Sequence, residues 1–303
     1  MKGLCALALL TLAAHAERIV ISNDDGWAVA QIRAQFNALV EAGHDVILSA
    51  PAENQSGRGG LQIPATPLLV SCEFDSCPAG ASKGNNASDP RLNWINAFPA
   101  DGAQYGIQTL APRLWNGAAP DFLVSGPNVG LNTGIALPFS GTVGAAGKAV
   151  QLGVPAVAFS GVSTAQESYN ALAVTPASAT VAAAKAYTTL ASAFLDALFA
   201  QPAAQPAYLP AGVLLNVNLP ALNDTCTPAR VAWVLTRGFP VLLGNPDVVT
   251  CSNGGRLPTE GDVVNSGCYA SVSVINATTK VDVGKSLQQD VLNRLVNLGL
   301  SCI

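Results

Sequence analysis

The sequence predicts an α/β fold of the Rossmann-like, doubly wound kind, in which a mainly parallel sheet leads into an irregular, β-containing C-terminal part. Three observations support this prediction. Short apolar runs rich in β-branched residues have the length and composition of buried parallel strands. Helical patterns alternate with these runs along the chain. Polar side chains and glycines follow several runs, at the place where ligands bind in open α/β sheets.

The expected elements of the first half follow in chain order. Residues 19–22 predict a buried strand, and residues 28–42 a helix that ends at Gly43. Residues 45–50 predict a second strand, parallel to the first through a right-handed crossover. The polar segment from Cys72 to Asn93 predicts an irregular surface loop. The further expected elements are a helix over residues 100–111 stopped by Pro112, a strand over 121–125, a helix over about 140–152 and a strand over 156–160.

The C-terminal third has less regular patterns. Helices are expected over residues 177–200 and 285–298, and strands over residues 213–218, 231–236 and 270–275. The 303 residues, 50% of them hydrophobic, are enough for one large domain. We expect this domain to span residues 17–303, with a motif-bearing core over 18–220 and a decorated C-terminal part over 221–303.

Residues 1–16 have the pattern of a secretory signal peptide. Lys2 precedes a short apolar run, and small residues precede the expected cleavage after Ala16. The run is too short for a permanent membrane anchor, so the sequence predicts a secreted, extracellular protein with no membrane partner.

The cysteines agree with export. Cys5 leaves with the signal peptide, and the six cysteines that remain predict three disulfides. The spacing of Cys72 and Cys77 predicts a local disulfide, whereas the pairing of the other four stays open. Asn86, Asn223 and Asn276 begin acceptor sequences for glycosylation.

Charge and histidine content exclude several function classes. A net charge of -4 with 11% charged residues gives no basic surface for a nucleic-acid polymer. After removal of the signal peptide His44 is the only histidine, so a Ser-His-Asp hydrolase or a histidine-dependent phosphatase is not expected. A small anionic substrate is compatible with this composition if a metal ion supplies the positive charge.

The end of the first expected strand carries the strongest functional pattern. Asn23, Asp24 and Asp25 follow it directly, and two adjacent carboxylates repel each other unless a cation lies between them. The pattern therefore predicts a site for a hard divalent cation. The alternative is that Asp24 or Asp25 only caps the next helix.

Two later loops carry similar donors. Residues 54–57 follow the second strand, and Asn128 and Asn132 follow the strand over residues 121–125. Carboxylate, hydroxyl and amide oxygens suit magnesium or manganese, and also calcium, better than zinc or copper. The segment from Ser140 to Gly144 opens a helix with free N–H groups and two hydroxyls, which predicts an anion-binding cradle. The alternative is that Ser140 only caps that helix.

These residues resemble one known family. The resemblance rests on collinear motifs between Arg18 and Pro220: Ser22-Asn23-Asp24-Asp25-Gly26, Gln55-Ser56-Gly57, Pro99-Ala100-Asp101, Ser125-Gly126-Pro127-Asn128, Ser140-Gly141-Thr142-Val143-Gly144 and Leu215-Asn216-Val217-Asn218-Leu219-Pro220. Together they resemble the SurE family of metal-dependent 5'/3'-nucleotidases and acid phosphatases. This chain departs from bacterial members in two places. They usually carry a histidine soon after the Ser56 position, where this chain has Arg58-Gly59-Gly60-Leu61-Gln62, and they usually carry an acidic residue near the position of Gly147-Lys148.

The resemblance implies a SurE-like phosphatase domain and assigns roles to residues. One divalent cation would be bound by Asp24, Asp25, Ser56 and Asn128. The phosphate would be surrounded by Asn23, Asn132, Ser140, Gly141 and Thr142. The residues expected to act in catalysis are Asp24, Asp25 and Ser140.

The sequence thus predicts a secreted phosphomonoesterase that hydrolyses nucleoside monophosphates or other small phosphate monoesters through a metal-activated water. A homo-oligomer is compatible with this prediction. Two alternatives remain: a metal- or ligand-binding protein of the same fold without catalysis, and a calcium-dependent nucleoside hydrolase.

Overall fold

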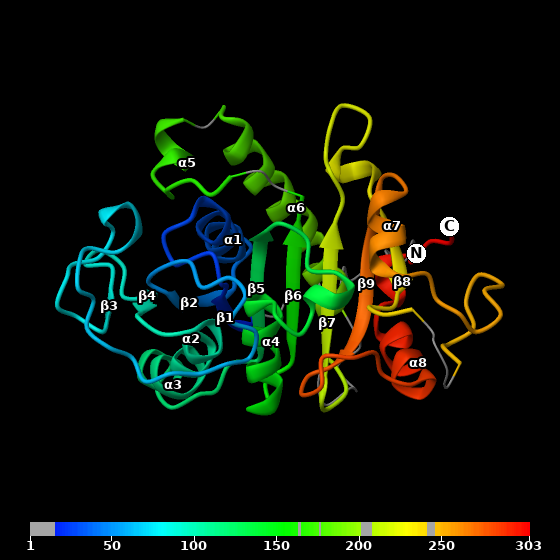
Figure 1. Cartoon of the computed structure of the whole chain (residues 1–303), viewed down its shortest axis with the longest axis horizontal. Helices are drawn as coiled ribbons and strands as arrows, with labels where there is room; N and C mark the ends of the chain where they lie inside the picture. Colours follow the sequence, from blue (N-terminus) through cyan, green and yellow to red (C-terminus); the bar gives the residue numbers. More distant parts are fainter. Residues whose placement is uncertain (1–15, 163–164, 176, 201–207, 241–245) are drawn as a thin grey trace, which may run out of the picture.

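The computed structural model describes residues 16–162, 165–175, 177–200, 208–240 and 246–303. The expected signal peptide therefore lies outside the described residues, apart from Ala16. The described strands form one nine-stranded sheet in the order β3-β4-β2-β1-β5-β6-β7-β9-β8 (Figure 1). Their bounds are β1 (Arg18–Ser22), β2 (Asp45–Pro51), β3 (Lys83–Asn85), β4 (Leu92–Ile95), β5 (Phe122–Val129), β6 (Ala156–Gly161), β7 (Val213–Leu219), β8 (Ala232–Thr236) and β9 (Tyr269–Asn276).

The sheet confirms the predicted fold class. All its pairings are parallel except β3 with β4 and β7 with β9. From β1 the chain continues to β2 on one side, and it later returns to β5 on the other side. The strand order therefore reverses between β1 and β5, and ligands of open α/β sheets bind beyond the carboxyl ends of strands at such a point.

Helices cover both faces of the sheet (Figure 1). The described α-helices are α1 (Ala30–Glu41), α2 (Pro99–Tyr105), α3 (Ala111–Leu114), α4 (Gly141–Gln151), α5 (Ala171–Val174), α6 (Ala179–Phe199), α7 (Glu260–Asn265) and α8 (Lys285–Arg294). Alternate residues of β1 serve the two layers: Ile19 and Ile21 pack in the core that includes side chains of α1 and α6, and Val20 packs with side chains of α2 and α4.

Two expectations about local structure were wrong. The segment from Cys72 to Asn93 is not wholly irregular, because β3 and the start of β4 lie in it. The short apolar run of β4 pairs with β2, and the indole of Trp94 lies against Gly84 of β3. The helix expected to stop at Pro112 continues through a π-helical turn to Leu114. Pro112 lies in the first turn of α3, where its missing N–H is not needed.

Three disulfides confirm the expectation from the cysteine count. Cys72 pairs with Cys77, as the spacing predicted, and the other pairs are Cys226–Cys268 and Cys251–Cys302. No helix of the described residues is long and apolar enough to cross a membrane.

Candidate functional site

Asp24 and Asp25 are buried at the carboxyl end of β1, with relative exposures of 3% and 1%. Thr142 of α4 donates to Asp24 Oδ1 at 2.6 Å, and the Val129 N–H at the end of β5 donates to Asp25 Oδ2 at 2.9 Å. Burial raises the pKa of Asp24, and burial together with the charge of Asp24 raises the pKa of Asp25 to about 8. Two buried carboxylates held this close disfavour full ionisation unless a cation binds them.

Asn128 supplies an acceptor without a partner. Its Nδ2 donates to the Gly130 carbonyl at 2.7 Å, while its Oδ1 is buried and has no hydrogen-bond partner in the part of the chain that the structure describes. A buried acceptor left unpaired costs about 1–3 kcal/mol. Asn128 Oδ1 and the buried carboxylates are oxygen donors that would hold a hard divalent ion, and such an ion would remove that cost.

The loop after β2 lies against the same place. The Gln55 N–H donates to the Asp24 carbonyl at 2.7 Å, and the exposed Ser56 donates its N–H to Asn54 Oδ1 at 2.8 Å. Asn54 Nδ2 contacts Gln166 Oε1 at 3.1 Å, and Gln166 Nε2 in turn donates to Asp25 Oδ1. Ser56 is exposed and lies one residue from the backbone contact to Asp24. No group of three or more histidine, cysteine or acidic side chains that suits a metal is found among the described residues.

The contacts of Asn54 lead to a prediction about glycosylation. Asn54-Gln55-Ser56 has the form of an acceptor sequence, but a glycan on Asn54 Nδ2 would replace its contact to Gln166. We expect Asn54 to be unmodified in active protein, and sugar to be found at some of Asn86, Asn223 and Asn276. Glycopeptide mass spectrometry checks this, and full occupancy of Asn54 in active protein would contradict it.

The start of α4 faces Asp24. Ser140 is the N-cap, and its Oγ accepts from the Val143 N–H at 3.1 Å. The backbone N–H groups of Gly141 and Thr142 favour the ionised form of Asp24. A Cβ on Gly141 would lie 2.7 Å from that of Asp24, so only glycine permits this approach. In this arrangement the helix start already stabilises one anionic group, the carboxylate of Asp24.

Asn23 and Asn132 have mainly internal partners. Asn23 Nδ2 donates to the Gly26 carbonyl and its Oδ1 accepts from the Gly26 N–H, at 3.0 and 3.2 Å. These two bonds close the turn that carries Asp24 and Asp25. Asn132 Nδ2 donates to Ser160 Oγ at 2.8 Å, which fixes the loop after β5 to β6.

A buried polar network supports that loop from β7. The Asn132 N–H donates to Asn218 Oδ1 at 2.8 Å, and the Asn132 carbonyl accepts from the side-chain amides of Asn216 and Asn218. Asn216 Nδ2 also donates to Glu260 Oε1 of α7 at 2.7 Å. Burial raises the pKa of Glu260 to about 7.

Glu260→Gln is therefore expected to change how stability depends on pH. Because the folded protein holds the Glu260 proton more tightly than the unfolded chain, its free energy of unfolding falls as pH rises between about 4.5 and 7. In Glu260→Gln the decrease in free energy of unfolding over this pH range should be smaller by roughly 3 kcal/mol. Denaturant unfolding at about pH 5 and about pH 8 measures the difference, with Glu41→Gln, at the exposed last residue of α1, as control. An unchanged slope in Glu260→Gln would contradict the assignment.

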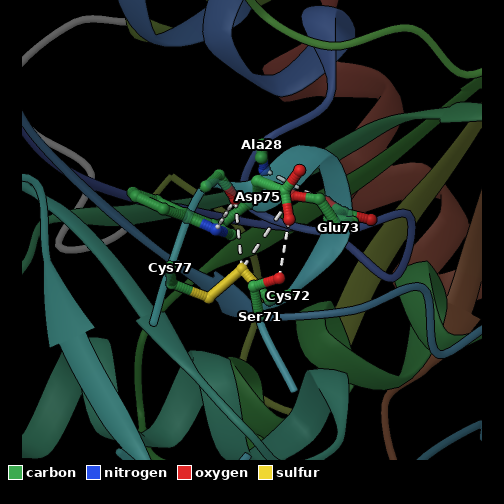
Figure 2. Close-up of a disulfide and its surroundings, with 8 residues drawn as sticks. Ala28, Ser71, Cys72, Glu73, Asp75 and Cys77 are labelled. Atoms are coloured by element: carbon green, nitrogen blue, oxygen red, sulfur yellow. Dashed lines mark hydrogen bonds between the residues drawn. A yellow bond between two sulfur atoms is a disulfide. The ribbon is translucent and has the colours of Figure 1, made fainter. Parts of the chain in front are cut away.

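A disulfide loop braces the turn after the carboxylates (Figure 2). Glu73, next to Cys72, accepts the Ala28 N–H at 3.2 Å, and Ser76 accepts the indole N–H of Trp27 at 3.0 Å. Gly26, at φ +114°, has no room for a side chain because the Glu73 carboxylate fills that space. The Cys72–Cys77 disulfide thus holds a carboxyl group against the backbone that presents Asp24 and Asp25.

Comparison with known proteins decides the family. A family model described as Survival protein SurE matches residues 19–238. The chain belongs to the SurE family. An acid phosphatase of Yarrowia lipolytica is 31% identical over 304 residues, which are 91% of this chain and 84% of that protein. A 5'-nucleotidase SurE of Solidesulfovibrio magneticus is 35% identical over 143 residues, or 47% of this chain and 49% of that protein.

A solved structure agrees on the fold. The crystal structure of SurE protein from Aquifex aeolicus aligns with a TM-score of 0.59 and 19% identity, covering 91% of this chain and 98% of that one. The SurE match ends two residues after β8, so β9, α7 and the Cys251–Cys302 disulfide lie beyond it, whereas Cys226–Cys268 joins a cysteine within the match to one beyond it.

Several residues of this SurE site were not assigned a role from the sequence. The sequence contains a pattern that could have indicated Asn216 and Asn218, because two amides spaced by two in a buried strand point to the same face. No such pattern indicates a role for Gln166, Glu73 or Glu260. They lie in segments without a motif, and only the fold brings them to the site.

Proposed function

We propose that the chain is a secreted, divalent-metal-dependent phosphomonoesterase that acts on nucleoside monophosphates or other small phosphate monoesters. The class of phosphoric monoester hydrolase follows from membership of the SurE family and from relatives named acid phosphatase and 5'-nucleotidase. The observation that supports the metal most directly is the buried, unpartnered Oδ1 of Asn128, whose neighbour Val129 donates its N–H to the buried carboxylate of Asp25. Three disulfides support secretion.

We assign binding of the cation to Asp24, Asp25, Asn128 and Ser56. When bound, magnesium or manganese supplies a positive charge for a phosphoryl oxygen and lowers the pKa of a water. The protein's own contribution is orientation: Thr142 fixes Asp24, whereas Val129 and Gln166 fix Asp25. In this proposal one of the two carboxylates also directs the attacking water or protonates the leaving oxygen.

We assign the phosphate to the space in front of α4. The Ser140 hydroxyl accepts from Val143 and keeps its own hydrogen free to donate to a phosphoryl oxygen. The Thr142 hydroxyl donates its hydrogen to Asp24, so its contribution comes through that carboxylate. Gly141 lets the backbone approach closely, and Asn132 is held by Ser160 at the rim of the loop after β5.

A substrate panel tests the proposal. The purified protein is assayed for phosphate release from nucleoside 5'- and 3'-monophosphates and simple aryl phosphates, first with chelator and then with magnesium, manganese, calcium or zinc restored. We expect phosphate release that the chelator abolishes and magnesium or manganese restores. Metal binding without any hydrolysis would instead support a binding protein, and release of a free base from nucleosides would support a nucleoside hydrolase.

A further inference from the structure

A polar cavity lies along one side of α4, from Pro138 and Gly144 near the start of the helix to Gln151 at its end. It has a volume of about 270 Å³. Gly144, Lys148 and Gln151 line one side, and their spacing of four and three residues places them on one face of α4. Thr278, Thr279 and Lys280, in the turn after β9, line the other side.

Lys280 has a buried side chain, which is unusual for a lysine in a turn. It is 8% exposed, and burial lowers its pKa to about 8. Its Nζ donates to the Ala277 carbonyl, which uses one of three hydrogens. No salt bridge to a carboxylate is recorded for Lys280 or Lys148 across the described ranges. A buried ammonium without a counter-charge is unfavourable, and either loss of its proton or a bound anion removes this cost.

The backbone of Lys280 has an unfavourable conformation in this turn. Lys280 has φ +60°, a left-handed conformation that glycine or asparagine adopts more readily. Gly147 of α4 lies directly under the Lys280 side chain, and a Cβ there would be 3.1 Å from Lys280 Cε and closer still to Nζ. The strained lysine and the glycine beneath it together place the ammonium beside the cavity.

We propose that this cavity binds a phosphate-type oxyanion between Lys148 and Lys280, with the hydroxyls of Thr278 and Thr279 as further donors. The two ammonium groups are the charged side chains of its described lining, which contains no carboxylate. Two cations and two hydroxyls are the donors that a tetrahedral oxyanion accepts. None of its lining residues is one to which we assign the cation or the phosphate, although Gly60, Pro138 and Gly144 lie near those residues in the chain. The proposal does not rest on the proposed function.

Titration calorimetry of the intact protein, with chelator present, tests the site. The probes are inorganic phosphate and methylphosphonate, whose P–C bond a phosphomonoesterase does not cleave. We expect saturable binding that Lys148→Gln and Lys280→Gln each weaken by about tenfold or more, the effect of losing one charge-assisted contact. Lys185→Gln, at an exposed position of α6, should bind like the parent. Tighter binding of phosphate identifies the free ion as ligand, and tighter binding of methylphosphonate identifies a phosphorus oxyanion that carries an organic group.

Melting temperatures separate loss of the site from loss of the fold. Lys148 is only half-buried, so Lys148→Gln is expected to fold even if Lys280→Gln does not, and Lys148→Arg should retain binding because it keeps the charge. Parent-like phosphate affinity in a folded Lys148→Gln, or absence of phosphate binding in the parent, would overturn the proposal.

Discussion

Asp24→Asn and Asp25→Asn are each expected to lower turnover on the order of 1000-fold or more, because each removes a charge that the cation requires while the side-chain volume stays the same. Both variants should remain folded. In the parent without metal these carboxylates are buried beside one another, so replacing one by an amide relieves repulsion.

Three measurements on the same variants check this result: turnover at saturating magnesium and manganese, melting temperature, and the rise in melting temperature on adding metal. The rise should be present in the parent and lost in both variants. Asp290→Asn, at an exposed position of α8, is the matched control and should behave like the parent. Near parental turnover in both variants would refute the assignment of the metal to this pair.

Ser140→Ala is expected to lose activity and stability together. The structure shows the cap, so about 1 kcal/mol of stability should be lost. If the hydroxyl also donates to the phosphoryl group, kcat/KM should fall by roughly 10- to 1000-fold, while metal affinity stays almost unchanged. Thr142→Ala should lower turnover as well, through the freedom it gives to Asp24.

A second helix of this chain provides a matched control for the cap. Ser178 is the N-cap of α6, and its Oγ also accepts from a valine N–H three residues on, at 3.1 Å. Ser178 Oγ also donates to Glu167 Oε2 at 3.1 Å, so Ser178→Ala should lose at least as much stability but keep turnover. If Ser140→Ala also kept turnover while losing stability, Ser140 would be a cap and nothing more.

The sequence predicted most strands of the central sheet because buried parallel strands have a distinct composition. The spacing of apolar residues and the composition were enough to predict β1, β2 and β5 to β9. They were not enough for β3 and β4, which are short and lie within a polar segment. The π-helical turn before Pro112 had no sequence signal either, because proline ordinarily ends a helix.

The sequence likewise predicted some features of the candidate site and not others. Residues within contiguous motifs, such as Asp24, Asn128 and Thr142, were assigned from sequence, and the structure brings their loops together. Which hydrogen bonds these residues form with one another was not predictable from the sequence. The bond from Thr142 to Asp24 depends on the orientation of α4 against β1, which follows from packing of the whole domain rather than from local pattern.

The connectivity of the three disulfides has a consequence for synthesis of the chain if it is exported, as proposed above. Cys72–Cys77 lies in the first third of the chain, and Cys226–Cys268 and Cys251–Cys302 both lie beyond Pro220. Synthesis runs from the N-terminus and early segments begin folding first. Cys72 and Cys77 can thus meet before any later cysteine has emerged, which leaves them little opportunity for a wrong partner. The nascent chain can brace the turn after Asp25 while its last third is still on the ribosome.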